Sequence, residues 1–214
     1  SGGNAGLAVA YAGRRLDVPV TVIVPITTKQ RAIDLIELEQ AQVIVKGANW
    51  NEAHQHALSL MTQESAYIHP YDDPYLWKGH ASIIDEIKSA GVKPDAIVLS
   101  VGGGGLLCGV VEGLINNSWS DVPILAVETK GAESFYTAAE AKKYIGIDTI
   151  SSIATSLGAV KVTKQAFNFL DSHPIVPRVV TDQQALTACF DFLYDHRVMV
   201  EPACGASLAT IYQA

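Results

Sequence analysis

The segment Ala96-Ile-Val-Leu-Ser-Val-Gly-Gly-Gly-Gly-Leu-Leu-Cys-Gly109 decides the fold of this chain. An apolar run of strand length ends in four glycines, and an apolar run of helical length follows them. Because glycine loses more backbone entropy on folding than any other residue, four in succession indicate that some group approaches the backbone closely. A turn into a helix N-terminus offers unpaired N–H groups and the positive end of the helix dipole, which suit a phosphate. The alternative is a tight turn that only lets a helix pack closely on a sheet.

On both sides of this segment, short β-branched runs alternate with amphipathic stretches. Strands are predicted at residues 18–25, 43–45, 96–100, 122–127 and 176–180. Helices are predicted at residues 4–16, 29–40, 51–64, 79–90, 106–115, 132–143 and 164–173, with a further helical pattern at 207–214. Short strands that alternate with helices form parallel βαβ units, so the sequence predicts an α/β fold with parallel or mixed open sheets.

The periodic pattern lapses between Tyr67 and Tyr75, where His-Pro-Tyr-Asp-Asp-Pro is typical of a loop. We therefore predict two α/β domains, a small one over residues 1–72 and a larger one over residues 73–214. Ligands of open α/β sheets bind beyond the carboxyl ends of the strands, so the site is expected there, between the domains. The chain starts without Met and ends within an apolar helical pattern, so both domains are expected to be partial, truncated at the two ends of the chain.

The composition argues against several classes of protein. Hydrophobic residues make up 49% of the 214 residues and charged residues 17%, which is typical of a compact enzyme rather than a disordered chain. A net charge of −7 argues against nucleic acid or an anionic membrane as a partner. No apolar run reaches about 18 residues, so no membrane span is predicted. Three cysteines without close pairing indicate neither a disulfide framework nor a metal site, and they fit the reducing cytoplasm.

The glycine run by itself leaves the identity of the phosphate ligand open. A nucleoside-triphosphate loop would place Lys and then Ser or Thr after its last glycine, but two leucines follow here. The dinucleotide fingerprint is nearly met by Gly103, Gly105 and Cys108. Glu128 ends the next predicted strand, where an acid would bind the ribose. An NAD-binding oxidoreductase is therefore one alternative function.

The chain opens with Ser1-Gly2-Gly3-Asn4-Ala5-Gly6, which leads into a predicted helix. Backbone N–H groups at that helix N-terminus, with the Ser and Asn side chains added, suit a carboxylate or a second anion. An ordinary Ser or Asn helix cap with a glycine turn is the alternative for this motif taken alone.

Six motifs occur in order along the whole chain: Ser1-Gly-Gly-Asn-Ala-Gly6, Trp77-Lys-Gly-His-Ala-Ser82, Ser100-Val-Gly-Gly-Gly-Gly-Leu106, Val127-Glu-Thr-Lys-Gly-Ala132, Ser156-Leu-Gly-Ala159 and Glu201-Pro-Ala-Cys-Gly-Ala206. Together they resemble the L-serine/L-threonine dehydratases among the fold-type II pyridoxal-phosphate enzymes, whose fold is tryptophan synthase β-like. The cysteine of the last motif is more similar to serine dehydratase than to the biosynthetic threonine deaminases. The resemblance implies a cytoplasmic homodimeric lyase of amino-acid metabolism that converts a small amino acid, L-serine, to pyruvate and ammonia. L-Threonine, which would give 2-oxobutanoate, is the alternative substrate.

The resemblance also implies roles for individual residues. The cofactor phosphate would be held by Gly102, Gly103, Gly104, Gly105 and Leu106, and the hydroxyl of the pyridine ring by Asn4. The substrate carboxylate would be held by Ser1, Gly3, Asn4 and Ala5. Family members bind a monovalent (K⁺) or divalent cation near the phosphate, whose ligands would be the Glu128 carboxylate and carbonyls near Ala132, Leu157 and Ala159. Oxygen ligands of this kind suit a hard cation rather than zinc.

Two functional parts of the family pattern have no counterpart in the printed sequence. The lysine that forms the Schiff base with the cofactor is expected in a Ser-x-Lys motif upstream of Ser1, and the residue facing the pyridine nitrogen is expected beyond Ala214. No catalytic residue is therefore assigned, and the 214-residue chain by itself is expected to be inactive. Gly2 departs from the Ser or Ala that is common in serine dehydratases, which leaves rate and substrate preference open. A non-catalytic homologue with a binding or regulatory role is the other alternative function.

Overall fold

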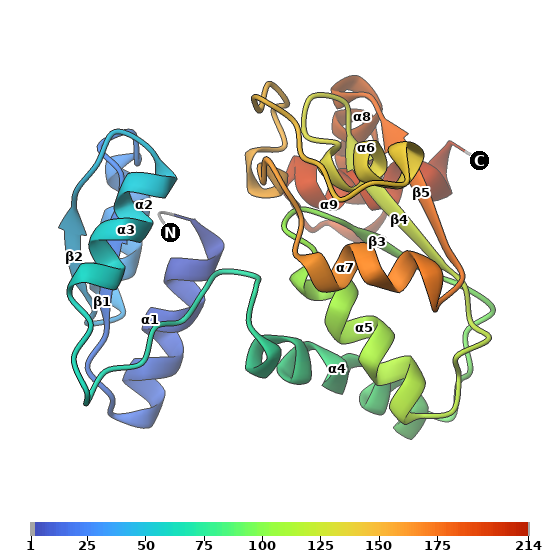
Figure 1. The fold of residues 1–214 in the computed structure, drawn as a ribbon. Helices are drawn as coiled ribbons and strands as arrows, with labels where there is room; N and C mark the ends of the chain where they lie inside the picture. The colour runs from blue at the N-terminus through green and yellow to red at the C-terminus, as the bar shows by residue number, and fades with distance from the viewer. Residues whose placement is uncertain (1–2, 214) are drawn as a thin grey trace. The chain divides into compact units, whose positions relative to one another are not determined.

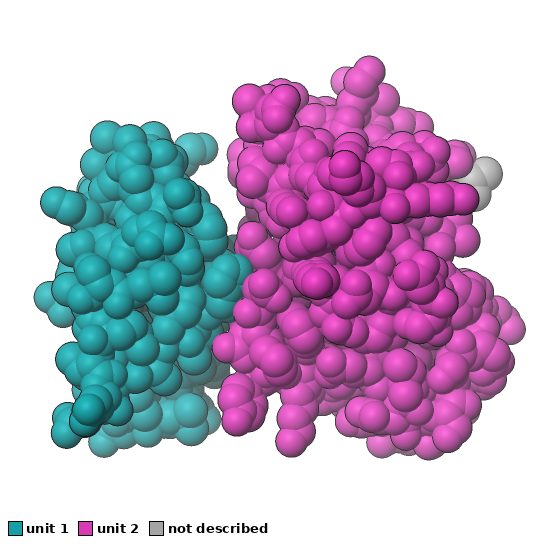
Figure 2. Space-filling model, viewed as in Figure 1, with its two compact units in different colours: residues 1–70 teal, residues 71–214 magenta. Residues whose placement is uncertain are grey.

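A computed structural model describes residues 3–213 of the chain, which divides into two compact units, residues 1–70 and residues 71–214 (Figure 2). Both units contain parallel strands joined by helices, so the predicted α/β class with parallel sheets is confirmed. No helix among the described residues is both long enough and apolar enough to cross a membrane.

The first unit is a βαβ arrangement with a helix before it and a helix after it (Figure 1). Its elements are α1 (Asn4–Leu16), β1 (Thr21–Val24), α2 (Gln30–Leu38), β2 (Gln42–Val45) and α3 (Trp50–Ser59). The two strands pair in parallel, with Thr21 opposite Gln42. Its small apolar core contains Ala10, Val22, Val24, Ile36 and Ala41.

The second unit is built on three parallel strands in the order β3-β4-β5. Its strands are β3 (Ile97–Ser100), β4 (Ile124–Thr129) and β5 (Ile175–Val180). Its helices are α4 (Pro74–Ser89), α5 (Gly105–Asn116), α6 (Ser134–Ala141), α7 (Lys164–Asn168), α8 (Asp182–His196) and α9 (Pro202–Tyr212), with 3-10 turns η1 (Thr155–Leu157) and η2 (Phe169–Asp171). The register places Ile97 opposite Ile124 and Ile124 opposite Ile175, so the carboxyl ends of all three strands lie at one edge of the sheet.

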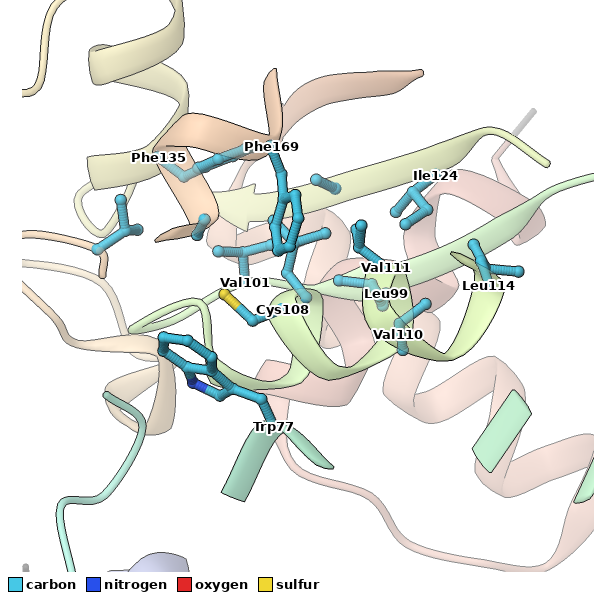
Figure 3. Packing of buried hydrophobic residues seen from close by; sticks show 14 of the residues in the cluster. Trp77, Leu99, Val101, Cys108, Val110, Val111, Leu114, Ile124, Phe135 and Phe169 are labelled. Carbon is cyan, nitrogen blue, oxygen red and sulfur yellow. The ribbon is translucent and has the colours of Figure 1, made fainter. Parts of the chain in front are cut away.

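Helices pack against both faces of this sheet, and successive side chains of a strand point to opposite faces. Leu99 and Ile124 belong to an apolar cluster that also contains residues of α4, α5 and α7 (Figure 3). Leu125 and Val127 instead pack with Ala188 of α8 and other small residues of α8 and α9. The sheet therefore lies between two helical layers, as expected for parallel strands that are connected by helices.

Several helices of the second unit differ from the sequence-based prediction; α9, for example, begins at Pro202, five residues before the predicted helical pattern. Helix α8 was not predicted, although Thr181 and Gln184 form a capping box at its start, a pattern that can be read from sequence. Helix α4 begins at Pro74, five residues before the predicted start, because the Asp73 side chain accepts a hydrogen bond from the Tyr75 amide and caps the helix.

Candidate functional site

The glycine run forms the turn between β3 and α5, at the carboxyl edge of the sheet. Gly104 precedes the helix with a φ of 91°, in the left-handed region that side-chain-bearing residues rarely adopt. Within residues 3–213, no oxygen accepts a hydrogen bond from the backbone N–H groups of Gly102, Gly103 or Gly104. The turn therefore presents unpaired donors beside a helix N-terminus, which is the arrangement that binds phosphate in other proteins.

Close packing also requires glycine at these positions. A Cβ on Gly102 would lie 3.1 Å from the Cα of Leu157, and a Cβ on Gly104 would lie 2.8 Å from the Cβ of Ala166. A Cβ on Gly103 would overlap the ring of Tyr71, whose nearest atom would be 2.1 Å away. The packing interpretation and the phosphate interpretation therefore hold for the same turn. Neighbouring residues pack against one side of it, and its backbone amides remain unpaired.

Tyr71 was not singled out from the sequence, yet its ring lies against Gly103. The indole N–H of Trp77 donates a hydrogen bond to the Tyr71 carbonyl over 2.8 Å, which fixes this residue beside the start of α4. The sequence His-Pro-Tyr-Asp-Asp-Pro predicts a loop, but it does not show that the ring of its tyrosine packs against Gly103.

Glu128, near the end of β4, is fully buried. Its two carboxylate oxygens accept hydrogen bonds from the Phe135 amide (2.8 Å) and the Tyr136 amide (2.7 Å) at the start of α6. Burial raises the pKa of this carboxyl to about 8, although the two amide donors oppose the shift. A carboxyl held in this way inside the unit is not placed to bind a ribose at the surface, so the geometry does not favour the dinucleotide alternative.

The hydroxyl of Ser134 is buried, on the first residue of α6, directly before Phe135, whose amide donates to this carboxylate. It has no hydrogen-bond partner among the described residues, which is uncommon for a buried hydroxyl. An unpartnered buried hydroxyl, on the residue before one of the amides that hold a buried carboxyl, is a natural ligand for a hard cation. Sequence reasoning missed Ser134, because a serine that begins a helix has a commoner explanation as a helix-terminal residue.

The backbone groups predicted to bind the cation lie at the same edge of the sheet. Ala132 and Leu157 are buried in one apolar cluster with Val127, the neighbour of Glu128 in β4. The Leu157 carbonyl accepts a hydrogen bond from the Ala159 amide over 2.8 Å. Leu157 also lies against Gly102, so this loop and the glycine turn are in contact.

The residues predicted to bind substrate lie in the first unit. Gly3 precedes α1 in an extended conformation, and Asn4 and Ala5 are the first residues of that helix. The Gly3 carbonyl accepts the Leu7 amide over 3.2 Å. Ser1 and Gly2 lie outside the described residues.

A surface cavity of about 460 Å³ lies next to the predicted cation ligands rather than at the glycine turn. Its lining is polar and consists of Lys130, Gly131, Glu133, Ser151, Thr181 and Asp182. These residues follow β4 and β5, so this cavity too opens at the carboxyl edge of the sheet.

A family model described as "Pyridoxal-phosphate dependent enzyme" matches residues 1–214. The chain belongs to this family. Among relatives, human L-serine dehydratase/L-threonine deaminase is 48% identical over 215 residues, covering 99% of this chain and 66% of the human protein. The human serine dehydratase-like protein is 44% identical and covers 99% of this chain and 65% of that protein. The chain thus spans slightly less than two thirds of the length of these relatives.

Solved structures of this family have the same fold. A fungal L-serine ammonia-lyase from Rhizomucor miehei superposes with a TM-score of 0.89 at 36% identity, over 96% of this chain and 66% of that structure. The processed threonine deaminase isoform 2 from Solanum lycopersicum gives a TM-score of 0.89 at 27% identity, over 100% of this chain and 64% of that structure.

Proposed function

We propose that this chain carries the cofactor site of an enzyme that deaminates L-serine to pyruvate and ammonia, with L-threonine as a second substrate. The observation that carries the proposal is the turn of Gly102–Gly104, whose amides are unpaired at a helix N-terminus. The names of the relatives, serine dehydratase and serine ammonia-lyase, support the choice of substrate.

In this proposal the second unit is the larger, cofactor-binding domain and the first unit is the smaller domain that binds substrate. The amides of Gly102–Leu106 would hold the cofactor phosphate, and Gly104 supplies the left-handed turn that aims them. When bound, pyridoxal phosphate would supply an electron sink for removal of the substrate α-proton. Asn4 would hydrogen-bond the ring hydroxyl, and Ser1, Gly3, Asn4 and Ala5 would hold the substrate carboxylate.

A cation is the second ligand that we propose. Its ligands would be the Glu128 carboxylate, the Ser134 hydroxyl and the carbonyls of Ala132, Leu157 and Ala159. The support comes from the buried carboxyl and the buried, unpartnered hydroxyl, which fit a hard ion such as K⁺ or a divalent ion. The cation would fix the loop that lies against Gly102 and so stabilise the phosphate turn.

Two further features follow from the resemblance alone. We propose that the complete protein acts as a homodimer and that it is located in the cytoplasm. Size-exclusion chromatography with light scattering tests the first, and localisation of a tagged protein tests the second.

Cofactor retention is the direct test of this function. Purified chain is equilibrated by dialysis against pyridoxal phosphate or against NAD, and the ligand retained with the protein is measured by absorbance. We expect retention of pyridoxal phosphate and none of NAD. The reverse result would favour the oxidoreductase alternative.

Turnover is tested separately, in a chain extended to the full length of the relatives. L-Serine should give pyruvate and ammonia in equal amounts, with pyruvate measured by a coupled lactate dehydrogenase assay. An extended chain that retains cofactor but releases no pyruvate would instead support the non-catalytic alternative.

A further inference from the structure

Two serines of one loop donate hydrogen bonds to two carboxylates, each of which lies at the start of a different helix. The loop comprises residues 151–159 and contains the proposed cation ligands Leu157 and Ala159. The Ser152 hydroxyl donates to Asp182, the first residue of α8, over 2.6 Å. The Ser156 hydroxyl donates to Glu201, which directly precedes α9. Both pairs join residues that are far apart in the sequence, so they fix the loop to the body of the second unit.

Ser152, which is buried, is the centre of a hydrogen-bond network. Its oxygen also accepts the Ala154 amide over 3.0 Å and lies 2.7 Å from the hydroxyl of Thr129, which is fully buried. Because the one Ser152 proton goes to Asp182, the Thr129 hydroxyl must donate to Ser152. The second Asp182 oxygen accepts the Ile153 amide over 3.0 Å, so both oxygens of this carboxylate hold the loop. Thr129 directly follows Glu128, so the network connects the loop to the strand that carries the proposed cation ligand.

The Glu201 carboxylate accepts a hydrogen bond from the loop and does not cap its own helix. Glu201 is the N-cap residue of α9, but its side chain makes no capping hydrogen bond there. Ser156, its partner, has its carbonyl oxygen 3.4 Å from the position that a Cβ of Gly102 would take. The pair therefore lies beside the glycine turn.

Ser100 fixes the helix that carries Glu201. Its hydroxyl donates to the Ala203 carbonyl over 2.6 Å and accepts from the Ser207 amide over 3.2 Å. Ser100 is the last residue of β3, two residues before Gly102, the first residue of the glycine turn. The start of α9 is thereby fixed relative to the glycine turn, and Glu201 with it.

We infer that the pairs Ser152–Asp182 and Ser156–Glu201 are positioning pairs that set the affinity of the cation site. None of these four side chains is a proposed ligand, so they act through the Leu157 and Ala159 carbonyls that they hold in place. Residues that orient metal ligands from outside typically change metal affinity by about 10–100-fold when they are removed. This inference rests on the proposed cation site and adds the residues that determine its strength.

The test is cation-dependent thermal unfolding of the purified, cofactor-free chain. Potassium chloride and, separately, magnesium chloride are titrated against tetramethylammonium chloride at equal ionic strength, and the half-saturating concentration is taken from the rise in Tm. For whichever cation stabilises the wild type, Ser156→Ala and Asp182→Asn should raise that concentration by about tenfold or more. Asp182→Asn keeps the size of the side chain but turns an NH₂ group toward one of its two donors. Ser156→Thr keeps the hydroxyl on an exposed residue and should retain the wild-type value.

Ser151→Ala is the matched control, because Ser151 is the exposed neighbour of Ser152 and lies outside both pairs. The wild-type half-saturating concentration in both Ser156→Ala and Asp182→Asn would overturn the positioning role. A wild type that shows no cation-specific rise in Tm would overturn the cation site and this inference together. Cofactor retention, measured independently, would still test the phosphate turn in that case.

Discussion

The Cα atom of Leu157 lies 3.1 Å from the position that a Cβ of Gly102 would occupy. The loop proposed to hold the cation thus rests on the turn proposed to hold the cofactor phosphate, with no space for a side chain between them. Movement of one segment must therefore displace the other, because a packed interior does not deform continuously. The two proposed ligands should consequently affect each other's affinity.

We therefore predict that removal of the cation weakens retention of pyridoxal phosphate. Coupling between two sites is commonly worth about fivefold or more in affinity, and the cofactor Kd should rise by at least that factor in tetramethylammonium buffer. Quenching of intrinsic tryptophan fluorescence by added cofactor would measure the Kd in each buffer. Equal values in the two buffers would show that the contact between the segments carries no coupling.

Gly104→Val should weaken cofactor retention and also lower the stability of the second unit. A side chain at a φ of 91° costs about 1–3 kcal/mol, and the added Cβ would lie 2.8 Å from the Cβ of Ala166. Gly79→Ala is the matched control, since Gly79 lies within α4 and a Cβ there meets nothing within 4 Å. That control should gain about 0.5–1 kcal/mol in the free energy of unfolding and keep its cofactor. Urea unfolding and equilibrium dialysis with pyridoxal phosphate give the two quantities, and full cofactor retention by Gly104→Val would exclude this turn as the phosphate site.

The substitution Ser134→Ala tests whether the Ser134 hydroxyl is a cation ligand or an ordinary buried hydroxyl. The hydroxyl has no partner among the described residues, so its removal should leave the stability of the cation-free chain unchanged or slightly raised. The rise in Tm on cation addition should shrink, because one oxygen ligand is lost. A loss of stability without cation, combined with an unchanged cation response, would indicate that the Ser134 oxygen has only a structural role.

Protonation of His173 should make the second unit less stable in mild acid. One ring nitrogen, Nε2, lies 2.9 Å from the Val122 carbonyl, and the buried Nδ1 has no partner among the described residues. Burial lowers the pKa of His173 below its ordinary value of 6.5, although the bond to Val122 opposes this shift. The unfolded chain therefore binds a proton at a higher pH than the folded chain does. The resulting stabilisation is present above pH 6.5 and is lost as the pH falls through the folded pKa.

The measurement is the free energy of unfolding between about pH 5 and pH 8 for the wild type and His173→Gln. Glu128 acts in the opposite direction, because its raised pKa makes the folded chain bind the extra proton, and half-buried His80 has a lowered pKa as well. Both groups are present in both proteins, so the difference between the two curves isolates His173. Parallel curves would contradict the prediction.

The alternation of strands and helices could be predicted from the sequence, but not every individual helix could. The strands and the glycine turn have local signals, since β-branched runs and consecutive glycines act on their own backbone. Helix α8 was missed because its buried side is made of small residues, Ala185, Ala188 and Cys189, whereas the larger Phe190 and Tyr194 are exposed. A search for large apolar residues at helical spacing therefore finds the wrong side of this helix, and only the capping box identifies it.

The candidate site could be predicted in part for the same reason. The glycine turn and Glu128 stand at strand ends, which a coarse prediction of strands already locates. Ser134 and Ser152 gain their importance from burial and from partners elsewhere in the chain. Neither property is a local property of sequence, so such residues are found only once the fold is known.

The bond between Ser100 and the Ala203 carbonyl joins residues 103 positions apart. Contacts of such long range form late in folding, because a large loop must close before they contribute any stability. On a ribosome, β3 and the glycine turn would be synthesised well before α9 could dock against them. Cofactor binding should therefore be acquired late in synthesis, and nascent chains released before α9 is complete should not retain the coenzyme.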